Sequence, residues 1–239
     1  GSSMIQFSDI YERTVNLIDD PDINRAYLTN TIEFQKIMYN FLINGLSYIT
    51  HPIKVTDALA QYDKPTGETE VGACEAGKQT YEVSMEIPED ADVVFYIDTP
   101  NKKGVLVKQQ AEATYDATDK TVTFVKPVSD GEQYEIEWYK AGEFTADFTQ
   151  AGAAIGSSMT KRVIEILART TVIAWAEKEQ NFLLDIRNLL NDTDFKLHSP
   201  ANSLKTKTEW VKDLQFEIYS LQNRLDWDLR NRSVSWYGY

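Results

Sequence analysis

Few residues of this sequence have types and spacings suited to acid–base or nucleophilic chemistry. The two histidines are His51, directly before Pro52, and His198, in a Ser-Pro loop. Either ring could serve as a base, but neither has an aspartate, serine or cysteine at a spacing known for catalytic groups. The single cysteine, Cys74, lies in VGACEAG without a histidine nearby, which favours a small buried thiol over a nucleophile. We therefore predict no catalytic residues and no enzymatic activity.

Sites for cofactors and metal ions have no clear signature either. The sequence lacks a glycine-rich phosphate loop, a G-x-S-x-G motif and an H-E-x-x-H motif. With a single cysteine the chain can form neither an intrachain disulfide nor a zinc site that needs several thiolates. The absence of an intrachain disulfide is what we expect of a protein in a reducing cytosol. The acidic pairs Glu135/Glu137 and Asp90/Asp92 are explained by a solvated sheet face, with a calcium site in PEDAD (88–92) as the lesser alternative. We expect no cofactor and no metal.

The net charge of −13 is concentrated in the middle of the chain. Residues 51–150 carry 20 acidic and 9 basic side chains, whereas residues 151–239 carry 11 acidic and 12 basic ones. The acidic middle should be solvated and should repel nucleic acid, while the nearly neutral ends can pack together or against neighbours. The acidic charge argues against nucleic acid as a partner. No apolar run approaches the roughly 20 residues of a membrane span, so a membrane is not expected as a partner either.

Helical periodicity begins at the N-terminal end of the chain. Apolar residues at spacings of three and four predict a first helix over DIYERTVNLI (9–18), with Ser8 as its N-cap. The segment DDPD (19–22) breaks this helix. The same spacing predicts one long second helix from about Ile23 to Ile49, which Pro52 ends.

Two further helices are predicted after the middle of the chain. A helix over about 158–190 carries a stripe that is broken only by Glu179: Ile164, Leu167, Thr171, Trp175, Phe182, Ile186 and Leu189. A last helix should begin where Thr206 and Glu209 form a capping box. Its apolar stripe is Trp210, Val211, Leu214, Ile218, Leu221, Leu225 and Leu229. We expect Trp175 and Trp210 to lie in a shared core.

Between about Thr56 and Phe148 the apolar period changes to two, which is typical of strands. Alternate positions are apolar in TYEVSMEI (80–87), with Tyr81, Val83, Met85 and Ile87, and in EQYEIEWY (132–139), with Tyr134, Ile136 and Trp138. Turn residues occupy TPNKKG (99–104), DATDK (116–120) and SDG (129–131). Six or seven short strands at this spacing predict a small β-sandwich of the general immunoglobulin-like architecture.

The order of these elements predicts an α+β protein. Neither pair of helices can bury its apolar faces alone, so residues 1–55 and 150–230 should pack together as one helical bundle. The β-sandwich, residues 67–148, is then an insertion whose ends lie close together. We expect that deleting it would leave the bundle folded. Residues 231–239 follow as an aromatic tail.

The tail suggests an interaction with a partner. Trp236, Tyr237 and Tyr239 follow a charged stretch that includes Arg230 and Arg232, and these five residues are the predicted partner-binding site. Tryptophan and tyrosine are favoured at interfaces because they bury much area with few rotatable bonds. The rings could instead fold back on the protein's own helices. Truncation after Arg232 should preserve folding and abolish partner binding if the tail serves a partner.

The helical parts of the chain resemble the head–tail connector (adaptor) proteins of tailed bacteriophages. The matching pieces are NRAYLTNTIEFQKIMYNFLINGLSYI (24–49), the helices over 158–190 and 207–230, and the tail 231–239. Connectors are helical bundles that form a ring under the portal and reach a neighbouring ring component with their C-terminal segments. The resemblance implies a structural virion protein that is assembled in the host cytoplasm as a homo-oligomeric ring, with a portal or tail protein as partner. Another neck or tail component of the virion is the alternative within the same class.

The β-insertion departs from the minimal connector and leaves an alternative open. The β-sandwich could be a binding module that recognises a carbohydrate or a cell-surface protein, with the helices as its mount. The exposed aromatic residues of such a module would be Tyr96, Tyr115, Trp138 or Tyr139.

Overall fold

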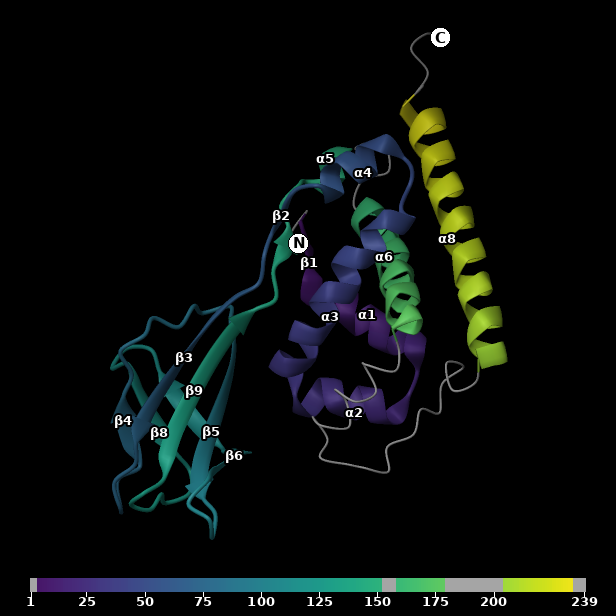
Figure 1. The fold of residues 1–239 in the computed structure, drawn as a ribbon. Helices are drawn as coiled ribbons and strands as arrows, with labels where there is room; N and C mark the ends of the chain where they lie inside the picture. The colour runs from purple at the N-terminus through teal and green to yellow at the C-terminus, as the bar shows by residue number, and fades with distance from the viewer. Residues whose placement is uncertain (1–3, 152–157, 179–203, 234–239) are drawn as a thin grey trace. The chain divides into compact units, whose positions relative to one another are not determined.

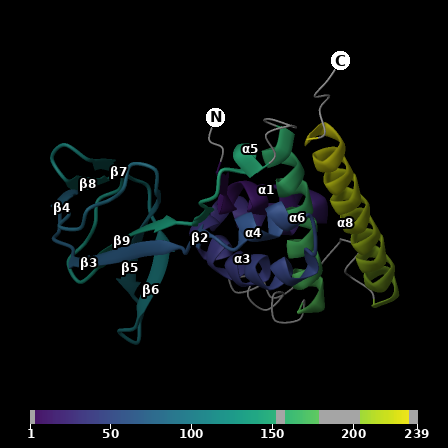
Figure 2. The ribbon, with the colours of Figure 1, turned by 90° about the horizontal axis from the view of Figure 1, so that it is seen from above.

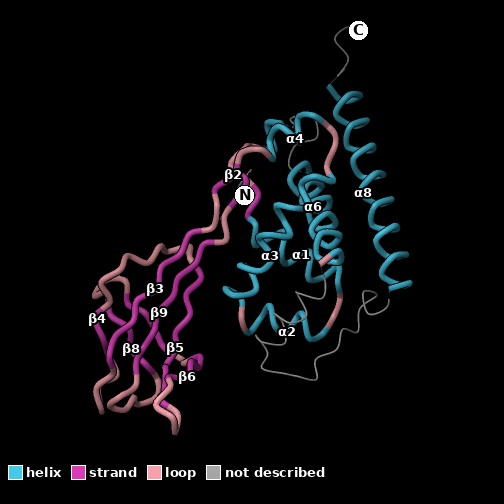
Figure 3. The backbone as a smooth tube through the Cα atoms, viewed as in Figure 1, coloured by secondary structure: helices cyan, strands magenta, loops and turns pink. Residues whose placement is uncertain are grey.

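The computed structural model describes residues 4–151, 158–178 and 204–233 and has a mixed α+β fold with three small antiparallel sheets (Figures 1 and 3). The chain divides into two compact units: the helical unit, residues 1–64 with 141–239, and the β unit, Pro65–Lys140. Each unit contains its own cluster of buried hydrophobic side chains. The two units are therefore described separately.

The first helix, α1 (Phe7–Ile18), begins earlier than the sequence pattern predicts. Its N-cap is Gln6, so the expected N-cap Ser8 is wrong and lies within the first turn. The short strand β1 (Ile5–Gln6) pairs with β10 (Glu143–Phe144), and the Phe7 N–H donates to the Gly142 carbonyl at 3.0 Å. A long-range pairing therefore sets the start of the helix, and such a pairing leaves no local sequence signal.

The predicted single helix over 23–49 is also wrong. The segment forms α2 (Pro21–Thr29), α3 (Thr31–Gly45) and the 3-10 turn η1 (Leu46–Tyr48). Asn30, with φ −131° and ψ 51°, separates α2 from α3. The Asp20 carboxylate caps α2 by accepting hydrogen bonds from the backbone of Asp22 and Ile23. The apolar spacing continues across the break, which is why the pattern did not reveal it.

A further helix, α4 (Ile53–Leu59), occupies a segment where strands were expected to begin. Its buried residues Val55, Ala58 and Leu59 have helical spacing and join the core of the helical unit. The strand β2 (Tyr62–Asp63) then pairs with β10, which completes the sheet β1–β10–β2 within the helical unit. Residues 56–64 therefore belong to the helical unit.

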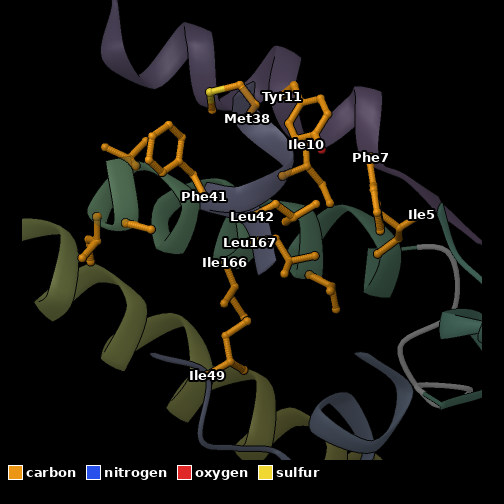
Figure 4. Close-up of a cluster of buried hydrophobic side chains, with 14 of the residues drawn as sticks. Ile5, Phe7, Ile10, Tyr11, Met38, Phe41, Leu42, Ile49, Ile166 and Leu167 are labelled. Carbon is orange, nitrogen blue, oxygen red and sulfur yellow. The ribbon is translucent and has the colours of Figure 1, made fainter. Parts of the chain in front are cut away.

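The helix α6 (Ser158–Glu177) packs against α1, α3 and α8. Its buried residues are Met159, Val163, Ile166, Leu167, Ala168, Thr170, Thr171, Val172, Ile173, Ala174, Trp175 and Ala176. These residues lie on all sides of the helix because neighbouring helices cover more than one of its faces. In Figure 4, Leu42 of α3 and Leu167 of α6 lie in one cluster with Ile10 of α1. Helix α3 approaches closely at Gly45, where an added Cβ would lie 2.7 Å from the Thr170 carbonyl oxygen. The part of the predicted helix over 179–190 lies outside the described residues.

The last helix, α8 (Leu204–Ser233), lies beside α6 (Figures 1 and 2). It begins before Thr206, so the predicted capping box is wrong. Its predicted apolar stripe is confirmed: Leu214, Ile218, Leu225 and Leu229 are buried, and Trp210, Val211 and Leu221 pack against the same core. Trp175 is fully buried as predicted, and Trp210 is partly buried with its ring centroid 6.0 Å from that of Trp175.

The β unit consists of two antiparallel sheets. The larger has the order β3 (Thr66–Ala73), β9 (Gln133–Lys140), β5 (Asp92–Pro100), β6 (Leu106–Gln110). The smaller has the order β4 (Thr80–Glu82), β8 (Thr121–Phe124), β7 (Ala113–Asp116). The predicted burial is confirmed for Tyr81, Val83, Tyr134 and Ile136, which lie in one cluster that Met85 and Ile87 flank. The strand predicted over 80–87 is shorter than expected, because β4 ends at Glu82, and Trp138 is buried outside this cluster.

The boundary of the β unit differs from the expected 67–148. Residues 141–148 belong to the helical unit, as does the short helix α5 (Phe148–Ala151). Phe144 and Phe148 are both fully buried there, and the Phe144 ring lies 4.9 Å from that of Phe7. The strand period continues through β10, so the pattern could not show where one unit ends and the other begins.

Candidate protein-interaction surface

Ion pairs and apolar contacts fix one side of α8 to the rest of the helical unit. Arg162 of α6 binds Asp228 of α8, with 2.7 Å between Nη1 and Oδ2. Arg169 of α6 binds Glu217 of α8, with 2.7 Å between Nε and Oε2. Arg162 and Asp228 are 23% and 15% exposed, so this pair is better shielded from solvent than an ordinary surface pair. In the second pair Arg169 is 15% exposed and Glu217 is 49% exposed, so the shielding is one-sided.

The same network extends to α1 through Glu165. One carboxylate oxygen of Glu165 lies 2.8 Å from Arg13 Nε, and the other lies 2.6 Å from Arg169 Nη1. Burial by itself would raise the pKa of Glu165, but the hydrogen bonds from Arg169 and Arg13 outweigh burial and hold the pKa below its ordinary value. Glu165 thus joins α1, α6 and, through Arg169, α8.

We expect acid to weaken this network. Because the pKa of Glu165 is lowered in the folded protein, its stabilisation is complete above the unfolded pKa, about 4.3, and is lost as the pH falls through the lower folded pKa. Urea unfolding of the wild type and of Glu165→Gln, compared across this range, should show the wild-type advantage shrinking as the pH falls. A difference in the free energy of unfolding that stays constant across this pH range would contradict the lowered pKa of Glu165.

A second set of hydrogen bonds ties α8 to the segment before α4. The Gln222 Oε1 atom accepts from the backbone N–H groups of Thr50, at 2.8 Å, and His51, at 3.2 Å. His51 Nε2 lies 2.7 Å from Asn223 Oδ1, and its Nδ1 lies 2.9 Å from Thr50 Oγ1. His51 thus contacts an amide and a hydroxyl in a structural clip, rather than a carboxylate that could orient it as a base.

The opposite side of α8 carries large aromatic side chains in contact with solvent. Phe216, Tyr219 and Trp227 are 71%, 60% and 65% exposed. Successive residues of a helix are rotated by about 100°, so these three lie on one side, opposite the stripe that contains Leu214 and Ile218. We call Phe216, Tyr219 and Trp227 the outer aromatic face of α8. A helix with apolar residues on two opposite sides has a second surface that can be buried by a partner.

The predicted partner-binding residues are only partly within the described structure. Arg230 lies on the same side of α8 as the outer aromatic face, with a side chain that is 78% exposed and binds Asp226 at 3.1 Å. Arg232 lies in α8, with its side chain outside the described part, and Trp236, Tyr237 and Tyr239 lie outside the described residues.

Sequence reasoning missed Phe216, Tyr219 and Trp227. Their signal was present as a second aromatic series at helical spacing on the side away from the apolar stripe. The apolar stripe alone is sufficient to predict a packed helix, and the prediction does not include this second series.

The other candidate reactive residues have structural surroundings. Cys74 is buried, and burial together with the charge of Glu132 raises the pKa of its thiol, which lowers its reactivity. Across the described ranges, no group of histidine, cysteine and carboxylate side chains is arranged to hold a metal ion, the PEDAD turn included. His198 lies outside the described residues.

The aromatic residues suggested for ligand recognition by the β unit are not exposed as that alternative required. Tyr96, Trp138 and Tyr139 are buried, and Tyr115 is half-buried. The β unit does contain a pocket of about 370 Å³, lined by residues that include Phe124, Gln109, Lys126 and Glu132. Three of the four suggested aromatic residues thus contribute to packing.

Comparison of the chain with protein-family models, curated proteins and solved structures finds no match. Among the described helices, none combines the length and the apolar character needed to cross a membrane. A functional interpretation therefore depends on the chain's own surfaces, among them the outer aromatic face of α8.

Proposed function

We propose that the protein is a structural component of a tailed-bacteriophage virion, a head–tail connector that forms a ring and docks on portal or tail components through its C-terminal segment. The observation that carries this proposal is the outer aromatic face of α8, which immediately precedes the predicted aromatic tail. In this proposal α1, α3, α6 and α8 form the connector's helical bundle, and the β unit is an inserted small β-sandwich.

The physical support is the cost of leaving such a face in water. A buried aromatic side chain removes about 150–250 Å² from solvent, and aromatic residues with arginine dominate the binding energy of many interfaces. Phe216, Tyr219 and Trp227 provide such aromatic residues on one side of a helix whose opposite side is already fixed. An assembly subunit needs this combination of a rigid mount and an exposed apolar surface.

We expect the triple variant Phe216→Gln, Tyr219→Gln, Trp227→Gln to lose assembly while it keeps its fold. Each side chain is exposed, so each replacement should change stability by no more than about 0.5 kcal/mol. Truncation of an interface hot spot, in contrast, costs about 2 kcal/mol or more, roughly 30-fold in affinity for each residue. Native mass spectrometry and electron microscopy of the concentrated protein, alone and with a portal ring, would measure assembly.

Gln215→Ala is the matched control, because Gln215 is exposed on the same helix between the two faces. This variant should assemble like the wild type. A wild type that stays monomeric in the presence of a portal ring would contradict the proposed function. Unchanged assembly of the triple variant would instead show that the outer aromatic face is not needed for assembly.

A further inference from the structure

The structure contains a groove between the segment Thr50–Asp57 and the last turns of α8. The groove has a volume of about 600 Å³. Pro52, Ile53 and Leu229 contribute apolar surface, and Ile53 is 72% exposed although it is a large aliphatic residue. The groove is also lined by two cationic side chains, Lys54 and Arg230, and two carboxylates, Asp57 and Asp226.

Both walls of the groove are held in place. The clip formed by Gln222 and Asn223 holds residues 50–51 against α8, and the buried residues of α4 anchor the other end of the segment in the core. Asp228 fixes the last turns of α8 to α6 through Arg162. A groove with fixed walls can bind an extended segment without first having to become ordered.

We propose that this groove receives the aromatic tail, residues 234–239, of a neighbouring copy of this chain, an inference that rests on the proposed ring. The tail VSWYGY supplies one indole and two phenol rings. Such rings match apolar surface from Ile53 and Leu229 flanked by the cations of Lys54 and Arg230, which can lie over aromatic faces. Six residues reach at most about 20 Å when fully extended.

The sequence after α8 favours a neighbour's tail over the chain's own. Leu229 and Arg230 lie one turn before the helix ends at Ser233, so the chain's own tail would have to reverse at Val234 and Ser235 to enter the groove. Helices that end in a tight reversal usually have glycine or asparagine in the left-handed conformation, which a β-branched valine avoids. The first glycine of the tail is Gly238, which follows Trp236 and Tyr237.

In this proposal the aromatic tail and the outer aromatic face of α8 bind different partners. The tail links consecutive copies within the ring through the groove beside α4. The outer aromatic face of α8 then remains for the portal or tail component.

The test uses single-cysteine variants of the full chain in a Cys74→Ala background. Asp57→Cys introduces a thiol at an exposed position of the groove, and Ser235→Cys introduces one into the tail without removing an aromatic ring. The two proteins, with tags of different size, are mixed at assembling concentration and oxidised. Glu209→Cys, exposed near the start of α8, replaces Asp57→Cys as the matched control for random collisions.

We expect the Asp57→Cys and Ser235→Cys proteins to form a mixed disulfide-linked dimer that is at least 10-fold more abundant than the dimer from the control pair. Adding Ile53→Asp to the Asp57→Cys protein should abolish this dimer. A double variant with both cysteines should give linked oligomers rather than an internally closed monomer. An internally closed monomer, or no enrichment over the control, would overturn the inference. Native mass spectrometry on the same samples distinguishes failure of this inference from failure of the proposed ring. Oligomers that form without this cross-link would contradict only the binding of the tail in the groove, and the proposed ring would stand.

Discussion

Replacing Trp175 by alanine is expected to lower the free energy of unfolding by about 3–5 kcal/mol, the usual cost of removing a large aromatic side chain from a core. Trp175 is fully buried in α6, a helix covered by α1, α3 and α8, and its ring meets that of Trp210 edge to face. The neighbouring helices are also joined by ion pairs, so they should collapse only partly into the space left behind. Urea unfolding followed by far-ultraviolet circular dichroism would measure the loss.

The matched control is Trp227→Ala in α8. Trp227 is 65% exposed, so its removal should change the free energy of unfolding by about 0.5 kcal/mol or less. Trp210→Ala should fall between the two, because Trp210 is only partly buried. Equal losses for Trp175→Ala and Trp227→Ala would mean that the packed faces of α6 or α8 have been assigned incorrectly.

Deleting the β unit along its structural boundary should leave a folded helical protein. The deletion removes Pro65–Lys140 and joins the ends with a short Gly/Ser bridge. The ends lie close together because β2 and β10 are antiparallel neighbours, with Tyr62 paired to Phe144 and Asp63 to Glu143, and adjacent strands are about 5 Å apart. We expect a cooperative thermal transition and a strongly helical circular dichroism spectrum from this variant.

The deletion suggested by the sequence alone, residues 67–148, should instead fail. It removes β10, the central strand of the sheet β1–β10–β2, together with the fully buried Phe144 and Phe148. Each phenylalanine is worth about 3–5 kcal/mol in a core, and two such losses approach the whole stability of an ordinary domain. Cooperative unfolding of the 67–148 deletion, or loss of structure in the 65–140 deletion, would contradict the boundary.

Several features could be predicted from the sequence because their signals are local. The apolar stripe of α8 and the buried position of Trp175 follow from residues three and four apart, which share one face of a helix. The apolar faces around Tyr81 and Tyr134 follow from the strand period of two. The outer aromatic face of α8 has the same kind of local signal, but a prediction based on one apolar stripe for each helix does not include it.

Other features depend on contacts between residues distant in the chain. The start of α1 at Phe7 depends on the pairing of β1 with β10, and the extent of the β unit depends on β10 pairing with β1 and β2 rather than with strands of the β unit. The groove beside α4 brings Ile53 near Leu229, and the clip that holds it joins Thr50 to Gln222. Sequence periodicity records which face of an element is apolar, whereas the choice of the partner that buries that face is made only when the whole core packs.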